Sequence, residues 1–158
     1  MNQGSMFITA NSQDEFKLAK SLFQKYANSL SFNLCFQDFE NELNQLSIQY
    51  NKPTGALILA YQNETAIGCV GVRYLDREVA ELKRMFVLPE FRKLKIGHRL
   101  LEEALKSAKE LGYNKIRLDT LQDMVAARAL YQKNGFYEIT SYRHNPIAGA
   151  IYMEKVLN

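Results

Sequence analysis

Apolar residues recur along this chain at two spacings. Near the amino end they fall three or four positions apart in two stretches, which predicts two amphipathic helices. The apolar positions are Phe16, Ala19, Leu22, Phe23, Tyr26, Ala27 and Leu30 in the first stretch, and Phe36, Phe39, Leu43, Leu46 and Tyr50 in the second. The second helix should end before Pro53, because the residue that precedes a proline is driven out of helical backbone. A short apolar run at residues 6–10 predicts a strand ahead of both helices.

The middle of the chain has the pattern of strands. Three apolar runs, at residues 56–61, 66–74 and 80–88, are separated by short polar turns at 62–65 and 75–78. Runs of this length joined by short turns predict an antiparallel meander.

The second half alternates helical and extended patterns. The predicted elements are a helix over 100–111 closed by Gly112, a strand over 115–120, a helix over 124–134 closed by Asn134 and Gly135, and strands over 136–142 and 150–157. A helical connection places the strands at 80–88 and 115–120 parallel, whereas short turns give antiparallel pairs. We therefore predict one α/β domain over residues 1–158. Its sheet should be mixed, mostly antiparallel and twisted, with about six to seven strands flanked by about four helices.

Composition narrows the possible functions. The net charge of +3 is mild and does not indicate a nucleic-acid or membrane partner. No apolar run approaches the ~18 residues that a membrane span needs. The two cysteines, Cys35 and Cys69, have no disulfide or zinc spacing, so we expect no metal site and a cytoplasmic location.

A basic segment at residues 90–101, EFRKLKIGHRLL, stands between a predicted strand and a predicted helix. The first N–H groups of a helix lack intrahelical partners, and the helix dipole adds positive charge there. Gly97 leaves room for a close ligand, and Arg92, Lys93, Lys95 and Arg99 add cations. The segment therefore has the features of a pyrophosphate site. A solvated basic loop is the alternative, and this segment alone leaves both interpretations open.

Three segments, which follow one another along the chain, favour the pyrophosphate site over the solvated loop. Residues 80–101, the LDT at 118–120 and AARALYQKNGF at 126–136 resemble the GNAT superfamily of N-acetyltransferases, and the matched core covers roughly residues 55–157. The family signature is Arg or Gln, two residues, Gly, one residue, then Gly or Ala. Here it reads Arg92-Lys93-Leu94-Lys95-Ile96-Gly97. The resemblance implies a GNAT-like sheet and acetyl-CoA as the acetyl donor.

The resemblance also implies a cofactor site. The pantetheine arm would lie along Met85, Phe86 and Val87, and the pyrophosphate would meet Arg92, Lys93, Leu94, Lys95, Ile96, Gly97 and His98. Lys95 departs from the family, because a glycine is usual at its position. A lysine is unfavourable there if φ must be positive. Either the loop still forms and the ammonium adds charge, which we favour, or CoA binding is weakened.

The implied reaction needs a base and an acid. Strand alternation places Glu81 on one face with Lys83, Met85 and Val87, and some family members carry a catalytic glutamate at this strand position. Burial would raise the pKa of Glu81 toward the working range. The alternative for Glu81 is a structural ion pair with Lys83 or Arg84.

Tyr131 matches the family tyrosine that protonates the departing CoA thiolate. A core aromatic beside Leu130 and Phe136 is the alternative for this residue.

Acceptor contacts are expected from the connection between the last two strands. Tyr142, His144 and Asn145, together with Arg143, lie in the segment SYRHNP at 141–146. His144 also competes with Glu81 as the base. Asp38, Glu40 and Glu42 could attract a cationic amine, although such a cluster is usually a solvated face.

The sequence therefore predicts an acetyl-CoA-dependent N-acetyltransferase. It would transfer the acetyl group to a primary amine of a small molecule or amino acid, by direct attack in a ternary complex. A catalytically silent CoA-binding or sensor protein and a protein (N-terminal or lysine) acetyltransferase are the alternatives. We expect no nucleic-acid or membrane partner and, by resemblance to small family members, a homodimer.

Overall fold

The computed structural model of the chain describes residues 4–30, 33–34 and 38–158. Seven of their strands form one sheet in the order β1-β2-β3-β4-β5-β7-β6. The strands are β1 (Ser5–Thr9), β2 (Ala56–Gln62), β3 (Thr65–Asp76), β4 (Val79–Val87), β5 (Lys115–Leu121), β6 (Tyr137–Ile139) and β7 (Ala150–Val156). Within this sheet the β4–β5 pair is parallel and the other pairs are antiparallel, which confirms the predicted mixed α/β architecture.

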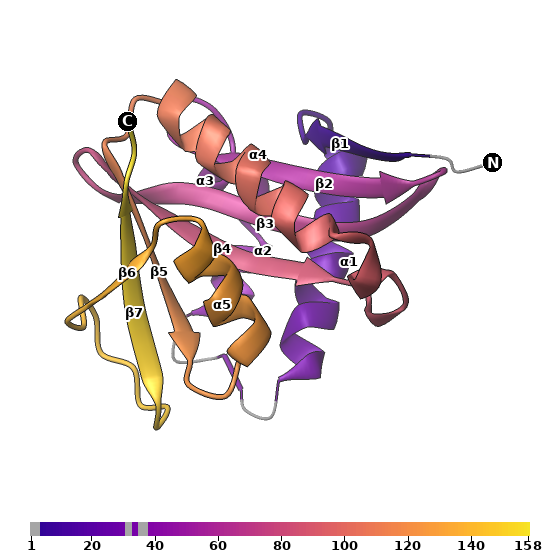
Figure 1. Cartoon of the computed structure of the whole chain (residues 1–158). Coiled ribbons are helices and arrows are strands. Elements are labelled where there is room, and N and C mark those ends of the chain that lie inside the picture. Colours follow the sequence, from indigo (N-terminus) through magenta and orange to yellow (C-terminus); the bar gives the residue numbers. More distant parts are fainter. Residues whose placement is uncertain (1–3, 31–32, 35–37) are drawn as a thin grey trace.

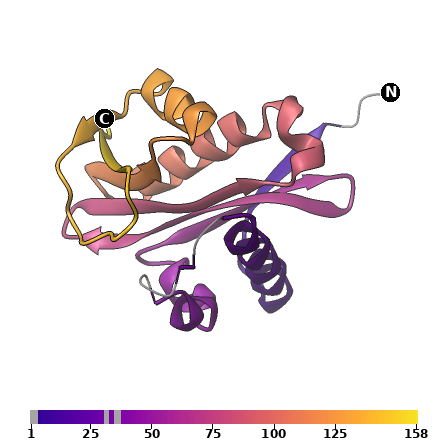
Figure 2. The same cartoon turned by 90° about the horizontal axis from the view of Figure 1, so that it is seen from below.

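Helices cover both faces of the sheet (Figures 1 and 2). They are α1 (Gln13–Ser29), α2 (Phe39–Leu43) and α3 (Leu46–Gln49) on one face, and α4 (Ile96–Glu110) and α5 (Val125–Lys133) on the other, with the 3-10 helix η2 (Pro89–Leu94) just before α4. A buried cluster lies between the sheet and each helical layer. The "α4 core" includes Ile58, Val70, Leu82, Leu100, Leu101 and Ile116, and the "α1 core" includes Phe16, Phe23, Tyr50, Leu57 and Phe86.

Local signals set the ends of the long helices. Ser12 caps α1 in a capping box, because its hydroxyl accepts from the Glu15 amide while the Glu15 carboxylate accepts from the Ser12 amide. Gly112 follows α4 with φ +96°, as its predicted closing role requires. None of the helices in the described ranges is long and apolar enough to cross a membrane.

The second predicted helix is two short helices, α2 and α3, separated at Asn44 and Gln45. Its apolar positions are buried as the spacing predicted, since Leu43, Leu46 and Tyr50 all lie in the α1 core. The periodicity identified the buried face but not the break. The predicted apolar position 36 lies outside the described residues.

The first of the two closing strands is much shorter than predicted. A strand was expected over 136–142, but β6 contains only Tyr137–Ile139. After Ile139 the chain leaves the sheet, and Tyr142 and Arg143 cross to the carboxylate of Glu81 on β4. Ion-pair and hydrogen-bond contacts therefore replace the strand pairing that the apolar pattern suggested.

A β-bulge in β4 reverses the side-chain alternation of that strand. Arg84 and Met85 together oppose Val70 of β3, because Lys83 pairs with Gly71 and Phe86 pairs with Cys69. Arg84 takes φ 58°, in the left-handed region. The predicted common face of Glu81, Lys83, Met85 and Val87 is therefore wrong.

On the amino-terminal side of the bulge, Ala80 and Leu82 face the α4 core. On its carboxyl-terminal side, Met85 and Val87 do so instead, while Phe86 enters the α1 core.

Candidate active site

The parallel strands β4 and β5 separate soon after they begin. They pair over three positions, Val79–Glu81 against Lys115–Arg117. Beyond these positions the two strands point apart, as their arrows do in Figure 1. The backbone of β4 from the bulge onward is therefore free of a β5 partner, which is where an extended ligand can add to the strand.

A cavity of about 100 Å³ occupies this separation. Leu82 and Met85 of β4, Leu118 of β5 and Ala127 of α5 contribute apolar atoms to its wall. Its polar lining consists of Tyr26, Lys83, Arg84, Asp119, Thr120, Tyr131 and Asn145. A partly open site in which polar side chains from several elements converge on an apolar wall is typical of a ligand pocket.

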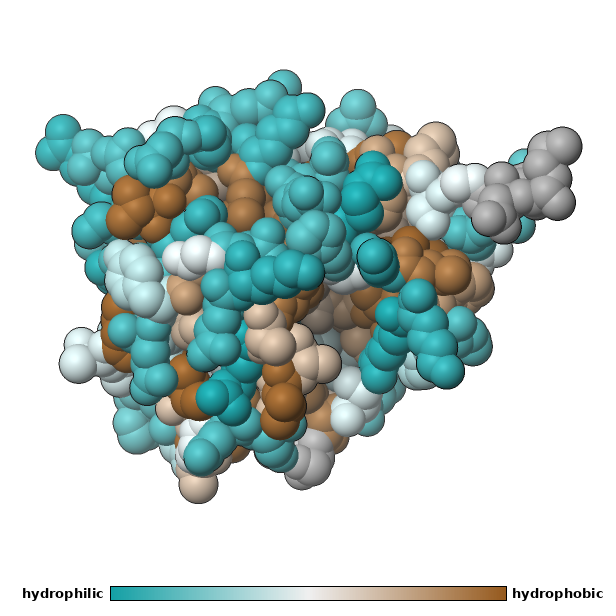
Figure 3. All heavy atoms as spheres, in the orientation of Figure 1, coloured by the Kyte–Doolittle hydropathy of each residue, from teal (hydrophilic) through white to brown (hydrophobic). Residues whose placement is uncertain are grey.

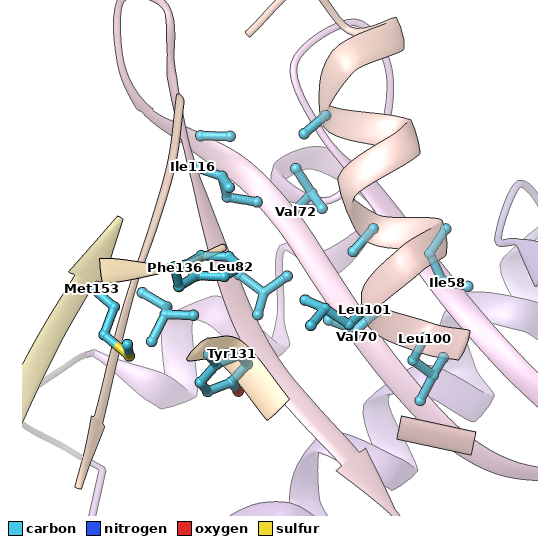
Figure 4. Packing of buried hydrophobic residues seen from close by; sticks show 14 of the residues in the cluster. Ile58, Val70, Val72, Leu82, Leu100, Leu101, Ile116, Tyr131, Phe136 and Met153 are labelled. Atoms are coloured by element: carbon cyan, nitrogen blue, oxygen red, sulfur yellow. The ribbon is translucent and has the colours of Figure 1, made fainter. Parts of the chain in front are cut away.

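Tyr131 reaches this cavity from α5. Its ring packs beside Phe136 with the ring centroids 5.6 Å apart, and it belongs to the α4 core. In Figure 4 its hydroxyl points away from Leu82 and Phe136. Burial, with the neighbouring Tyr26 and Asp119, raises the pKa of Tyr131, so the phenol stays protonated and able to donate at neutral pH. The two interpretations of Tyr131, core aromatic and cavity donor, therefore describe different parts of one side chain.

Lys83 and Asp119 face each other across the separated strands. The Lys83 Nζ lies 3.7 Å from Asp119 Oδ1, and Asn145 Nδ2 lies 3.4 Å from Asp119 Oδ2. Lys83 is 3% exposed, and burial lowers its pKa to about 8. Among the described residues, Asp119 is the one carboxylate in the cavity lining. A carboxylate and an amine that is partly neutral near physiological pH thus share this site.

The bulge is held in place by a buried ion pair. Glu42 of α2 accepts from Arg84 Nε at 3.1 Å and from Arg84 Nη2 at 2.7 Å, and it also accepts from the Tyr50 hydroxyl at 2.7 Å. Glu42 is 2% exposed, and this pairing lowers its pKa despite its burial. Of the three acidic residues predicted as a cluster, Asp38 and Glu40 are exposed, and Glu42 fixes the backbone of β4 from inside.

The expected rise in the pKa of Glu81 is wrong. Glu81 is buried, but Arg73 Nε lies 3.1 Å from its Oε1, and Arg143 and the Tyr142 hydroxyl both donate to its Oε2. Lys83, Arg73 and Arg143 outweigh the effect of burial and lower the pKa of Glu81 to about 2. Such a carboxylate is a weak proton acceptor, and Glu81 does not line the cavity. Glu81 is therefore part of a structural ion-pair network. The expected partners were Lys83 or Arg84, and the ion pairs that form are with Arg73 and Arg143.

The basic segment forms a turn followed by the start of α4. Lys95 ends η2 and precedes α4 with φ 60° and ψ 25°, the left-handed conformation for which a glycine is usual. The loop therefore forms with a lysine at that position. Within the described residues, no side chain caps the amino end of α4, which leaves its first N–H groups to another acceptor.

Gly97 lies in the first turn of α4, beside open space. A Cβ atom added there would meet only the Leu130 Cδ2, at 3.9 Å. The surface is hollowed between α5 and η2, with hydrophobic atoms inside a hydrophilic rim (Figure 3). The first N–H groups of α4 therefore border open space, where an anionic group could approach them.

Of the other predicted cofactor residues, one lines the cavity, some are buried in a core and some are exposed. Met85 lines the cavity, Phe86 is buried in the α1 core, and the Val87 carbonyl accepts from Arg92 Nε at 2.9 Å. Ile96 is buried in the α4 core. Lys93 and Leu94 are exposed on η2, and His98 Nε2 lies 3.6 Å from Glu102.

Of the three predicted acceptor residues, one lines the cavity and two lie outside its lining. Asn145 lines the cavity. Tyr142 donates to Glu81 at 2.9 Å and packs against Tyr152, outside the cavity lining. His144 is exposed and does not line the cavity, which gives no support to its role as the base.

The sequence interpretation missed Tyr26, Lys83 and Asp119 as cavity residues. Asp119 lies within the LDT segment that carried the resemblance, and strand alternation with Arg117 places it on one face of β5. That signal could have identified Asp119. For Tyr26, the sequence showed only an apolar position at helical spacing. That pattern does not distinguish a cavity residue from a core residue.

Comparison with known proteins agrees with this geometry. Residues 20–136 match the model of the acetyltransferase (GNAT) family. The chain is 37% identical over 142 residues to an uncharacterized N-acetyltransferase of Schizosaccharomyces pombe, covering 89% of this chain and 85% of that protein.

Solved structures share the fold. An acetyltransferase from Streptococcus agalactiae superposes with a TM-score of 0.80 at 23% identity, covering 99% and 100% of the two chains. The PaiA N-acetyltransferase from Thermoplasma acidophilum in complex with coenzyme A superposes with a TM-score of 0.72 at 22% identity, covering 98% and 99%. This chain, with its separated β4 and β5 strands and its matching family model, belongs to the acetyltransferase (GNAT) family.

Proposed function

We propose that this protein transfers the acetyl group of acetyl-CoA to a primary amine of a small molecule or amino acid, by direct attack in a ternary complex. The observation that carries the proposal is the cavity between β4 and β5, which brings Tyr131, Asp119 and the bulge of β4 together. Bound there, acetyl-CoA would supply a thioester-activated acetyl group.

The donor side is supported by two features of the chain. The uncapped amino end of α4, with Arg92, Lys93 and Lys95 just before it, offers N–H groups and positive charge to a pyrophosphate. The unpaired part of β4, beginning at the bulge, offers backbone groups to the pantetheine amides and to the thioester carbonyl.

Two side chains suit the proton transfers. The Tyr131 phenol, kept protonated by burial, would donate a proton to the departing thiolate. Asp119 would accept the proton that the acceptor amine loses, because it is a carboxylate in the lining and is oriented by Asn145. Glu81 and its arginines hold the β6–β7 connection against β4 from outside the cavity, and we assign them no proton transfer.

The acceptor is proposed to be a small amine because Asp119 and Asn145, the side chains that would serve it, lie in the lining of this cavity. A silent CoA-binding protein is the weaker alternative, since the Lys95 loop forms and both Tyr131 and Asp119 reach the cavity.

Calorimetric titration of the purified chain with acetyl-CoA tests the proposal. Dephospho-CoA and ATP serve as controls for the adenosine and phosphate parts of the ligand. We expect saturable binding of acetyl-CoA and acetylation of at least one member of a panel of primary amines. A folded chain that does not bind acetyl-CoA would contradict the proposal, and binding without turnover of any amine would favour the silent alternative.

A further inference from the structure

The cavity already contains a primary amine, the side chain of Lys83. It projects from β4 immediately before the bulge, and its Nζ lies 3.7 Å from Asp119, the proposed proton acceptor. Among the described residues, Lys83 is the one lysine in the cavity lining, and Tyr131 of α5 lines the same cavity. A group of the type that the enzyme is proposed to acetylate thus sits beside the groups proposed to acetylate it.

We propose that Lys83 is a site of self-acetylation, modified by bound acetyl-CoA when no acceptor amine fills the cavity. This inference rests on the proposed function, because it needs acetyl-CoA between β4 and β5. The side chain is held where it can react, since it is 3% exposed and its Nζ lies 3.7 Å from Asp119 Oδ1.

The proposed step follows the chemistry of the main reaction. The lone pair of the neutral Lys83 Nζ attacks the acetyl carbon, and an N–C bond forms as the C–S bond to CoA breaks. Asp119 accepts the proton that Nζ loses, and the thiolate takes a proton from Tyr131. The products are Nε-acetyl-lysine at position 83 and free CoA, so no oxidant or further reactant is needed.

The surroundings of Lys83 make this amine more reactive than a surface lysine. A protonated amine has no lone pair for attack, and burial lowers the pKa of Lys83 to about 8. The charged groups around it are Glu81 and Arg84 on β4, Arg73 on β3 and Asp119 on β5. Beyond them, Glu42 pairs with Arg84, Arg143 and Tyr142 contact Glu81, and Tyr26 and Tyr131 share the cavity.

Acetylation of Lys83 would close the site to the acceptor. It removes the positive charge opposite Asp119 and adds an acetyl group to a cavity of about 100 Å³. The modified chain would keep the basic loop and the start of α4, which lie outside this cavity. The expected result is a protein that binds acetyl-CoA through that loop but does not turn over an acceptor.

The test needs only the purified full chain and acetyl-CoA, without an acceptor. Peptide mass mapping over time would measure acetylation at each lysine, with exposed Lys109 as the internal reference and Lys109→Arg as the matched control for Lys83→Arg. We expect Lys83 to be modified at least about tenfold faster than Lys109 at about pH 7, where an ordinary lysine is almost fully protonated. Excess free CoA should slow modification of Lys83 but leave Lys109 unchanged.

The pH dependence gives a second readout. Acetylation of Lys83 should rise roughly tenfold between about pH 7 and 9 and then level off, whereas a surface lysine continues to rise toward about pH 10. In Lys83→Arg the modified peptide should disappear while Lys109 behaves as before.

Calorimetry on the same sample separates the two proposals. If acetyl-CoA binds but Lys83 reacts no faster than Lys109, or only after unfolding in urea, self-acetylation is wrong, while the proposed function is decided separately by the panel of amines. If acetyl-CoA does not bind, both fail. Because the decisive measurement is made on the unaltered chain, a Lys83 variant that does not fold leaves the test intact.

Discussion

The Tyr142 hydroxyl lies 2.9 Å from Oε2 of Glu81, so a side chain of the β6–β7 connection ends on a carboxylate 61 positions earlier in the chain. Arg143 donates to the same oxygen, and Arg73 of β3 holds the other one. This network joins β3, β4 and the β6–β7 connection, and each of its contacts is made to the ionised carboxylate of Glu81.

Replacing Glu81 with Gln should therefore destabilise the protein in a pH-dependent way. Above about pH 4.5 the variant should lose about 2–3 kcal/mol of unfolding free energy, because two arginines lose a buried partner. The pKa of Glu81 is lowered from 4.5 to about 2, so its stabilising effect is complete above pH 4.5 and disappears as the pH falls toward 2.

Urea unfolding at several pH values would measure this difference between Glu81→Gln and the unaltered chain. Glu102→Gln is the control, since that glutamate is exposed and should change stability by less than about 0.5 kcal/mol. If the difference in unfolding free energy between the two proteins stays constant down to about pH 2, the pKa of Glu81 is not lowered in the folded chain.

Replacing Asp119 with Asn should lower turnover without a matching loss of acetyl-CoA affinity. We expect a decrease of about a hundredfold or more in kcat with an accepted amine, because a positioned proton acceptor contributes on that scale. Activity should partly recover at higher pH, where more of the amine is already deprotonated. An Asp119→Asn enzyme with unchanged kcat at neutral pH would remove Asp119 from the reaction.

Tyr131→Phe should reduce kcat by about a hundredfold, because the phenylalanine ring preserves packing with Phe136 and removes only the hydroxyl. Acetyl-CoA affinity, measured by calorimetry, should change by less than about threefold, as a single hydrogen bond to the thioester contributes little to binding. If kcat is unchanged, the acid role of Tyr131 is wrong.

Lys95→Gly should stabilise the fold. A lysine at φ 60° costs about 1–2 kcal/mol, and part of the gain is offset by the greater freedom of glycine in the unfolded chain, so we expect about 0.5–1 kcal/mol. Lys95→Ala removes the same ammonium without relieving the backbone, so it should give no such gain in urea unfolding.

The same two Lys95 variants test the charge. If the ammonium contributes to phosphate binding, both should lose acetyl-CoA affinity equally, and more at low than at high salt. Loss in the alanine variant alone would mean that the backbone conformation, rather than the charge, matters.

Gly97→Val should weaken acetyl-CoA binding by at least about tenfold, because a branched side chain would fill the space beside the amino end of α4. The nearest atom to an added Cβ is Leu130 Cδ2 at 3.9 Å, so the fold should tolerate the change. Gly112→Val is the opposite control, since φ +96° strains any side chain there while the site is untouched. Normal acetyl-CoA affinity in Gly97→Val would contradict the phosphate site.

The sequence alone determined the element order, the parallel crossover and the position of the basic loop. Each follows from local periodicity, from turn length or from residue type, and these act over a few positions of the chain. It also identified Tyr131 and Asn145, which the structure places in the cavity lining.

Only the tertiary structure decided the faces of β4 and the state of Glu81. The bulge at Arg84 and Met85 adds one residue to the strand, and Glu42, distant in the sequence, holds it there, so simple alternation fails beyond that point. The pKa of Glu81 depends on Arg73 and Arg143, which β3 and the β6–β7 connection bring to it.

The cavity is likewise a product of chain packing. Tyr26, Lys83, Asp119 and Tyr131 come from α1, β4, β5 and α5, and they meet because two parallel strands separate after three pairs. Local sequence patterns carry each residue's preference for a helix or a strand. They do not carry the distances between elements, which depend on long-range packing and on charges paired across the fold.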